Sequence, residues 1–375
     1  MLKTGECLCH FCGKISEEVN YYNSDKNIHT VLKRDVFGKC YLAGMGADKK
    51  SLFRIDRKTR RGKAGQDLPV KIHAVQENSG EELVFLRICP HCCRNGKTNY
   101  LYPGQGEFPT YVVALAGARG VGKTTFVNAV RYPGNLLPLN EALTVLAPGL
   151  RIVPADSIGE TTDVKTTNRS ETGSTTLFDL TGNHKKIASL LIVDLAGELF
   201  EGKITESERG IFLEHADVLL VVDAADRGTG EVVSLYNGLK KLQYLDGIKS
   251  LCHVITCMDK VMDKKISYRG SSIPLFDKTT FHPQKKKSDY FPEEFLPRMA
   301  LENMIVSNYR LEAGARIAEK PQHRAGFFIQ TCRSEAQNPD AAQRSVYDTA
   351  VNIMDPLLWI LAELGFLKIG REKAQ

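Results

Sequence analysis

The sequence contains no apolar run long enough to cross a lipid bilayer. The longest such run near the C-terminus, Pro356–Ala362, is far shorter than the roughly 20 residues that a spanning helix needs, and Glu363 follows it. The first residues, MLKTGECLCHFCGK, lack the apolar core of a secretory signal. Internal repeats and low-complexity tracts are also missing. We therefore expect a soluble, cytoplasmic protein without a membrane span.

The chain has little excess charge of either sign. A formal net charge of +6 is small for 375 residues, so composition alone does not indicate a nucleic-acid partner. Residues Arg54–Lys63 carry six basic side chains, and we interpret this segment as a solvated hairpin tip, with a nucleic-acid contact as the alternative. Hydrophobic residues make up 42% of the chain, which is enough for one large domain or two smaller ones.

The ten cysteines are concentrated near the N-terminus, where seven of them lie in the first 93 residues. In a chain without a secretory signal, such clustering favours metal binding over disulfides. Two pairs, Cys9/Cys12 and Cys89/Cys92, have the Cys-x-x-Cys spacing that lets two thiolates reach one tetrahedral zinc ion. These pairs resemble the knuckles of zinc ribbons, and they predict a closed, structural four-cysteine site.

The two cysteine pairs are separated by 76 residues, a far longer gap than usual for a zinc ribbon. We therefore expect residues 1–100 to form a zinc-binding module with a long insertion that folds separately or as a β-rich lobe. Reduced, metal-free thiols or a redox pair are the alternatives to zinc. The residues that could replace one of the four ligands are Cys7, His10, His91 and Cys93.

From residue 110 onward, short apolar runs alternate with helical patterns. Strands are expected at 111–116, 174–180, 188–194, 217–223, 250–256 and 325–331, and helices from 123 and at 232–245, 292–318 and 345–366. Asp355 and Pro356 are expected to supply an N-cap and a first-turn proline to the last helix. The alternation predicts an α/β domain at 110–375 with a doubly wound, mainly parallel sheet.

Residues Gly117–Thr124 read GARGVGKT and match the phosphate-loop pattern G-x-x-x-x-G-K-[ST] in full. The match lies between an apolar strand and a helix, and the backbone N–H groups of such a loop curl around phosphates. Lys123 is expected to reach the terminal phosphates, and the Thr124 hydroxyl to bind Mg²⁺. Arg119 is either a further phosphate contact or a solvated side chain. The predicted nucleotide contacts of the loop are Gly117, Arg119, Gly120, Val121, Gly122, Lys123, Thr124 and Thr125.

A second element follows about seventy residues later, in the run LLIVDLAGE. Asp194 ends an apolar strand, which suits a carboxylate that holds Mg²⁺ through water. Here the chain resembles the TRAFAC class of P-loop GTPases, whose Asp-x-x-Gly follows such a strand, and the resemblance extends over residues 110–366. The segments DLAGE and DPLLWILAELGF are similar to GTPases of bacterial conflict and signalling systems. The resemblance implies that Gly197 senses the γ-phosphate through its backbone N–H.

The same resemblance implies roles for Glu198 and for two residues of the run VITCMDK. Glu198 stands where small GTPases have a water-orienting Gln. It acts either as a base or through a negative charge that repels the γ-phosphate, and we expect slow intrinsic hydrolysis that a partner accelerates. Thr256 and Asp259 occupy the positions of the guanine-recognition motif, in which the Asp carboxylate accepts both guanine N–H groups. Cys257 replaces the Lys of that motif. The alternative is that Asp259 is a solvated residue at a strand end.

A threonine between the first helix and residue 174 is expected to complete the Mg²⁺ site. Thr162 is preferred; the competing residues are Thr161, Thr166, Thr167 and Thr172. The sequence thus predicts a GTPase that uses GTP or GDP, Mg²⁺ and Zn²⁺, and whose zinc module recruits a protein partner. An ATPase coupled to nucleic acid and a scaffold that binds nucleotide without hydrolysing it are the alternatives.

Overall fold

The computed structural model describes part of the 375-residue chain. The described residues are 1–2, 6–9, 14–16, 18–37, 39–45, 50–55, 71–91, 101, 108–155, 175–195, 210–241, 248, 250–261, 265–268, 271–274, 286–311, 323–328 and 351–368. Within these ranges, no helix is long and apolar enough to cross a membrane.

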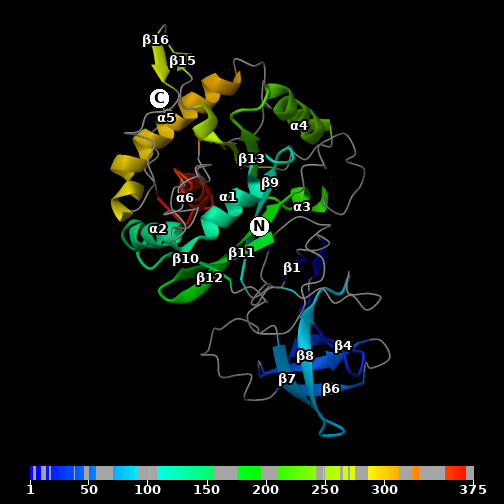
Figure 1. Ribbon diagram of the computed structural model, residues 1–375. Helices are drawn as coiled ribbons and strands as arrows, with labels where there is room; N and C mark the ends of the chain where they lie inside the picture. The colour runs from blue at the N-terminus through cyan, green and yellow to red at the C-terminus, as the bar shows by residue number, and fades with distance from the viewer. Residues whose placement is uncertain are drawn as a thin grey trace, which may run out of the picture.

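A seven-stranded sheet with the strand order β10-β11-β12-β9-β13-β14-β17 organises the larger part of the molecule (Figure 1). Its strands are β9 (Thr110–Ala116), β10 (Arg151–Pro154), β11 (Thr175–Gly182), β12 (Lys185–Asp194), β13 (Val218–Ala224), β14 (Ser250–Thr256) and β17 (His323–Phe328). The pairs from β12 to β17 are parallel, whereas β10–β11 and β11–β12 are antiparallel. The predicted mixed α/β class with parallel strands is confirmed, and an antiparallel edge is added to it.

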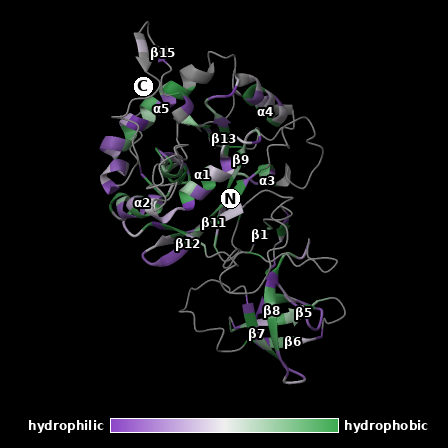
Figure 2. Ribbon diagram, in the orientation of Figure 1, coloured by the Kyte–Doolittle hydropathy of each residue, from purple (hydrophilic) through white to green (hydrophobic). Residues whose placement is uncertain are grey.

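Two hydrophobic cores cover the two faces of this sheet. One face packs against α1 (Lys123–Arg131), α2 (Pro133–Leu146) and α6 (Asp355–Glu363), and the other against α3 (Gly210–Glu214) and α4 (Thr229–Lys241). Side chains of β9 alternate between the cores, with Val113 and Leu115 in the first and Val112 and Ala114 in the second. Because both faces are covered, the central strands are continuous apolar runs, as Figure 2 shows for β9 and β13.

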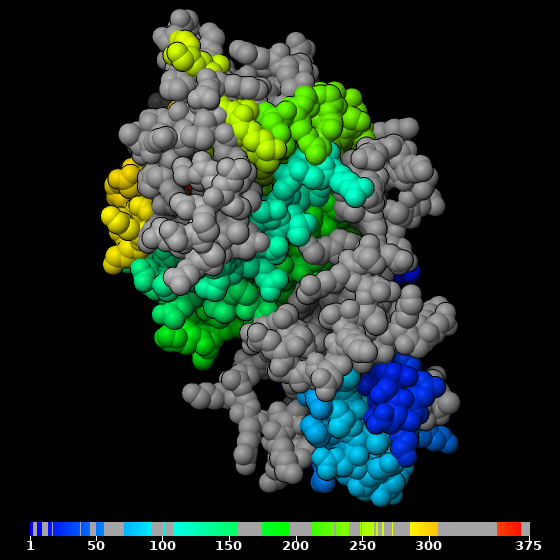
Figure 3. Space-filling view, in the orientation of Figure 1, coloured from blue at the N-terminus to red at the C-terminus, as the bar shows by residue number. Residues whose placement is uncertain are grey.

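A closed, six-stranded antiparallel barrel forms a separate body near the N-terminus (Figure 1). Its strands are β3 (Asn20–Asn23), β4 (Ile28–Arg34), β5 (Cys40–Gly44), β6 (Leu52–Ile55), β7 (Lys71–Gln76) and β8 (Glu82–Ile88). The pairing of β3 with β8 closes the ring, so the barrel has no unpaired edge. Tyr21, Phe53 and Phe85 fill its centre. In the space-filling view, the barrel segments, coloured blue and light blue, gather in one lobe at the bottom of the picture (Figure 3).

The barrel agrees with the expectation of a β-rich insertion between the cysteine pairs. The closure of the barrel could not be predicted from the sequence. It depends on strand register and on the pairing of β3 with β8, which are far apart in the chain, and neither leaves a local sequence pattern. A short hairpin of β1 (Cys7–Leu8) and β2 (Ile15–Ser16) precedes it. Leu8 packs into the hydrophobic core that also contains Leu195, after β12, and Phe212, in α3. Leu2 forms an antiparallel β-bridge with Thr110 of β9. The N-terminal hairpin therefore shares a core with the large sheet.

Helix α5 (Pro292–Leu311) is joined to the start of α6 by buried charges. Arg298 Nε and Nη2 donate to the Asp355 carboxylate at 2.6 and 2.8 Å, and both side chains are almost fully buried, at 4% and 0% exposure. The N-cap of α6 is Met354, not Asp355 as the sequence suggested, because the Asp355 carboxylate is engaged by Arg298. Pro356 does lie in the first turn. The remaining described elements are β15 (Lys265–Tyr268), β16 (Ser271–Pro274) and the 3-10 helices η5 (Met258–Val261) and η6 (Lys287–Tyr290).

Candidate nucleotide site

The phosphate loop connects β9 to α1 at the carboxyl edge of the parallel strands. Gly117 lies so close to β13 that a Cβ atom there would be 2.2 Å from the Val222 carbonyl oxygen. Gly122 has φ +87° and forms the N-cap of α1, a left-handed conformation that favours glycine. Two glycines of the motif are thus required by a close backbone approach and by the turn into the helix. The loop also leads into a helix N-terminus, which attracts anions.

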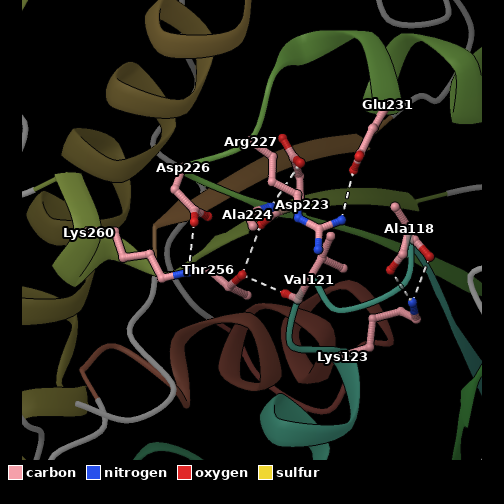
Figure 4. A network of polar contacts seen from close by, with 11 residues as sticks. Ala118, Val121, Lys123, Asp223, Ala224, Asp226, Arg227, Glu231, Thr256 and Lys260 are labelled. Atoms are coloured by element: carbon pink, nitrogen blue, oxygen red, sulfur yellow. Dashed lines mark hydrogen bonds and ion pairs between the residues drawn. The ribbon is translucent and has the colours of Figure 1, made fainter. Parts of the chain in front are cut away.

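Lys123 begins α1 and turns back into the loop. Its Nζ donates to the carbonyl oxygens of Gly117 at 2.6 Å and Ala118 at 2.8 Å, and the residue is only 7% exposed (Figure 4). Burial lowers the pKa of this ammonium; Asp194 acts in the opposite direction, and Arg227 lowers the pKa further. The ammonium is therefore a buried cation whose charged form is stabilised by a nearby anion.

Thr124 and Asp194 meet at the same end of the sheet. The Thr124 Oγ1 donates to Asp194 Oδ2 at 2.6 Å. The contact forms because β12 runs parallel to β9, with Asp194 in register with Leu115 at the ends of the two strands. Asp194 is 5% exposed. The hydroxyl and the carboxylate, which are seventy residues apart in sequence, form one oxygen-rich group next to Lys123.

The segment that the sequence predicts to recognise the base, VITCMDK, is attached to the loop through Thr256. Its Oγ1 lies 2.6 Å from the Val121 carbonyl oxygen and 3.1 Å from that of Asp223 (Figure 4). Cys257 has φ +57°, so the chain turns sharply there into η5. Asp259 lies in η5, and its side chain is outside what the structure describes. The Thr256 contact places the start of η5 beside the phosphate loop.

An ion pair joins η5 to the loop after β13. Lys260 Nζ lies 2.7 Å from Asp226 Oδ2, and this hydrogen bond lowers the pKa of the Asp226 carboxyl. The next residue, Arg227, lies against the phosphate loop, since a Cβ on Gly120 would be 2.9 Å from Arg227 Nη2. Sequence reasoning missed Arg227. The only signal was an arginine shortly after an apolar strand, which is too common to single out.

The other predicted nucleotide and Mg²⁺ residues have varied positions. Arg119 is exposed on the loop, and Thr125 is half-buried in the first turn of α1. Thr162, Gly197 and Glu198 lie outside the described residues, as do the competing threonines. The structure therefore brings together Lys123, Thr124, Asp194 and Thr256 and leaves the switch residues undescribed.

Cys9, of the first cysteine pair, directly follows β1. The Cys9 backbone N–H donates to the Lys14 carbonyl oxygen at 3.0 Å, which extends the β1–β2 pairing up to the turn. Cys9 is 1% exposed, and Cys12 lies outside the described residues. Cys9, the first residue of this Cys-x-x-Cys sequence, therefore lies at the end of the β1–β2 pairing.

Cys89, of the second pair, follows β8 and lies with Cys9. Cys7, Cys9, Cys89 and Leu101 form one buried cluster. The His91 backbone N–H donates to Cys89 Sγ at 3.4 Å, and His91 Nε2 donates to the Ile15 carbonyl oxygen at 3.0 Å. This contact ties the turn after Cys89 to the β1–β2 hairpin. Cys92 lies outside the described residues, and within the described part of the chain no group of three or more His, Cys, Asp or Glu side chains is arranged to hold a metal.

Arg87 supports the cysteine cluster from inside the barrel wall. It is fully buried, and its Nη2 donates to Cys7 Sγ at 3.1 Å. Burial raises the pKa of the Cys7 thiol, and Arg87 opposes the increase. Cys7 is thus held by Arg87 next to Cys9 and Cys89.

Comparisons with known proteins give limited information. No protein-family model matches the chain, and no curated protein matches it. Among solved structures, the G domain of the FeoB iron transporter of T. maritima is 15% identical to this chain. The match covers 59% of this chain and 88% of that G domain, with a TM-score of 0.23. A TM-score this low is too weak to support a functional argument. The function is therefore inferred from the geometry of the site.

Proposed function

We propose that the protein is a guanine-nucleotide-binding switch that hydrolyses GTP slowly. The contact between Thr124 and Asp194, next to Lys123 at the mouth of a Gly-rich loop, carries this proposal. A hydroxyl and a carboxylate are the oxygen donors that Mg²⁺ prefers. Magnesium bound there would neutralise charge on the phosphates during phosphoryl transfer. The residues present thus fit both a nucleotide phosphate chain and its Mg²⁺.

The residues of the candidate site have separate parts in the proposed reaction. Lys123 would exchange its loop carbonyls for the terminal phosphates, and Thr124 and Asp194 would hold the metal, which would supply positive charge beside those phosphates. Gly197 would sense the γ-phosphate through its N–H group, Glu198 would lie near the attacking water, and Thr162 would complete the metal site. Phosphoryl transfer of this kind depends on position and charge rather than on covalent catalysis. The negative charge of Glu198 near the γ-phosphate is the reason for slow turnover.

The preference for guanine is proposed from the base-recognition segment. Thr256 holds the start of η5 against the phosphate loop, and the Lys260–Asp226 pair holds η5 to the loop after β13. Both contacts support the proposal because they hold the backbone of η5, which carries Asp259, beside the phosphate loop. Cys257 lacks the aliphatic length of the Lys it replaces, so the preference for guanine over adenine is expected to be smaller than with a complete motif.

Competition binding tests the proposed function. GTP, GDP and ATP are each titrated against a bound fluorescent guanine nucleotide in the presence of Mg²⁺. GTP and GDP are expected to displace it at lower concentrations than ATP does. Lys123→Ala should abolish measurable binding, whereas Lys185→Ala, at an exposed position of β12, should leave it unchanged. Preference for ATP would support the ATPase alternative, and single-turnover assays with labelled GTP would distinguish a slow enzyme from a non-hydrolysing scaffold.

We also propose a structural zinc site formed by Cys9, Cys12, Cys89 and Cys92. Four thiols at this spacing form the donor set of a closed zinc site, and the N–H···S bond at Cys89 is typical of a metal knuckle. The Cys-x-x-Cys spacing makes Cys92 the preferred fourth ligand, and His91, whose Nε2 contacts the Ile15 carbonyl, is the alternative through Nδ1. Leu8 lies between this site and the core that contains Leu195, just after Asp194. That continuity supports a module that recruits a protein partner according to the bound nucleotide.

Metal analysis tests the zinc site. Protein purified without chelator is expected to contain about one zinc per chain, measured by elemental analysis. Cys89→Ser should lower both the zinc content and the melting temperature of the barrel, since structural zinc contributes directly to folding. Cys40→Ser, at a cysteine of β5 away from the cluster, is the matched control. Protein that is folded and free of zinc would contradict the proposal.

A further inference from the structure

Arg227 lies on the outside of the phosphate loop. It follows β13 in a turn in which its backbone N–H donates to the Ala224 carbonyl oxygen at 3.1 Å. Its Nη2 occupies the space beside Gly120, where an added Cβ would be only 2.9 Å away. Gly120 has φ +76°, so its backbone turns in the left-handed region within the loop. The guanidinium therefore touches the segment whose N–H groups are expected to surround the phosphates.

Two cations meet at this loop. Lys123 is buried within it, and Arg227 is near enough to lower the pKa of the Lys123 ammonium, after the larger effect of burial. Like charges at short range repel each other, so this arrangement is stabilised by an anion between or beside them. The phosphate chain of a nucleotide is the anion that the Gly-rich loop is built to accept.

One partner of Arg227 is an exposed carboxylate, that of Glu231. Arg227 Nη1 lies 3.1 Å from Glu231 Oε2, and the two side chains are 34% and 49% exposed. Figure 4 shows the guanidinium between Glu231 and the phosphate loop, with the ion pair on the side away from Lys123. Exposed pairs of this kind contribute little to stability, whereas a guanidinium binds phosphate oxygens in a bidentate manner. An arriving phosphate therefore competes well with Glu231.

We propose that Arg227 is a phosphate-binding residue of the nucleotide site, which exchanges Glu231 for the phosphates of a bound nucleotide. This inference rests on the proposed function and adds a second cation to it, supplied by the same chain. Glu231 holds the guanidinium beside the loop before binding, and it lowers the affinity to the extent that it competes. Removing the Arg227 side chain should therefore weaken nucleotide binding, whereas removing the charge of Glu231 should strengthen it.

Binding of fluorescent GDP and GTP to three variants tests the proposal. Arg227→Ala is expected to weaken both nucleotides about 10-fold, the usual loss for one charge-assisted contact. Arg227→Lys should recover part of the affinity, because it keeps the charge but loses the bidentate geometry. Glu231→Gln should tighten binding by a few-fold, since it removes the competing carboxylate. The dependence of binding on salt should decrease in Arg227→Ala and persist in Glu231→Gln.

Arg131→Ala, at the far end of α1, is the matched control and should bind as the wild type does. If Arg227→Ala and Glu231→Gln weaken binding equally, the pair is only structural and the inference is wrong. Unchanged affinity in Arg227→Ala would overturn it as well. Failure of the proposed function has a different signature, in which the wild-type chain and Lys123→Ala both fail to bind either nucleotide.

Discussion

Replacing Thr124 with valine is expected to raise the Mg²⁺ concentration needed for half-maximal GTP binding by about 100-fold or more, since even partners outside the metal's direct ligands contribute 10- to 100-fold. The hydroxyl of Thr124 donates to Asp194 at 2.6 Å, and both are proposed to hold the metal. Asp194→Asn keeps the shape and one oxygen and should cause a smaller loss, about 10-fold. Titration of MgCl₂ against the protein with a fluorescent GTP analogue measures both effects.

Thr144→Val provides a matched control for this experiment. Thr144 is an exposed threonine of α2 whose hydroxyl donates to the Glu141 carbonyl oxygen, away from the phosphate loop. The same substitution there should leave the Mg²⁺ dependence unchanged. Because Thr124 is exposed, its replacement by valine is not expected to unfold the protein. An unaltered Mg²⁺ requirement in Thr124→Val would show that the metal does not bind at this contact.

Asp355→Ala is expected to lower the free energy of unfolding by about 3–5 kcal/mol, because it leaves a buried guanidinium without its counter-charge. Burial by itself lowers the pKa of Arg298, but the Asp355 carboxylate more than offsets this effect, so the group stays charged. The single tryptophan, Trp359, lies in the same helix as Asp355 and is 6% exposed. Urea unfolding followed by its fluorescence therefore reports directly on this region.

Two further variants separate the ion pair from ordinary packing. Arg298→Met combined with Asp355→Leu should be much more stable than Asp355→Ala, since apolar replacement of a whole buried pair is often neutral. Lys260→Ala breaks an exposed pair, in which the side chains are 51% and 34% accessible, and should change stability by less than about 1 kcal/mol. Equal losses in Asp355→Ala and in the double variant would mean that packing, not charge, dominates here.

Much of the larger domain's secondary structure is local and could be predicted. The strands β9, β12, β13 and β14 are continuous apolar runs because both of their faces are buried, and such runs are visible in any sequence. Other elements have no local sequence pattern from which they could be predicted. Helix α2 contains Pro138 and a glycine in its first turn, which locally suggest a loop, and packing against the sheet overrides that preference. The edge strand β10 has only four residues.

The sequence by itself determined the Gly-rich loop and the two Cys-x-x-Cys pairs, because each depends on residue types at short, fixed spacing. Only the tertiary structure decided which distant groups meet at these sites. The Thr256 contact with Val121, the approach of Arg227 to Gly120 and the burial of Cys89 with Cys9 all join segments that the strand order brings together. Strand order and register arise from packing across the whole sheet and barrel. For that reason, no local pattern encodes these contacts.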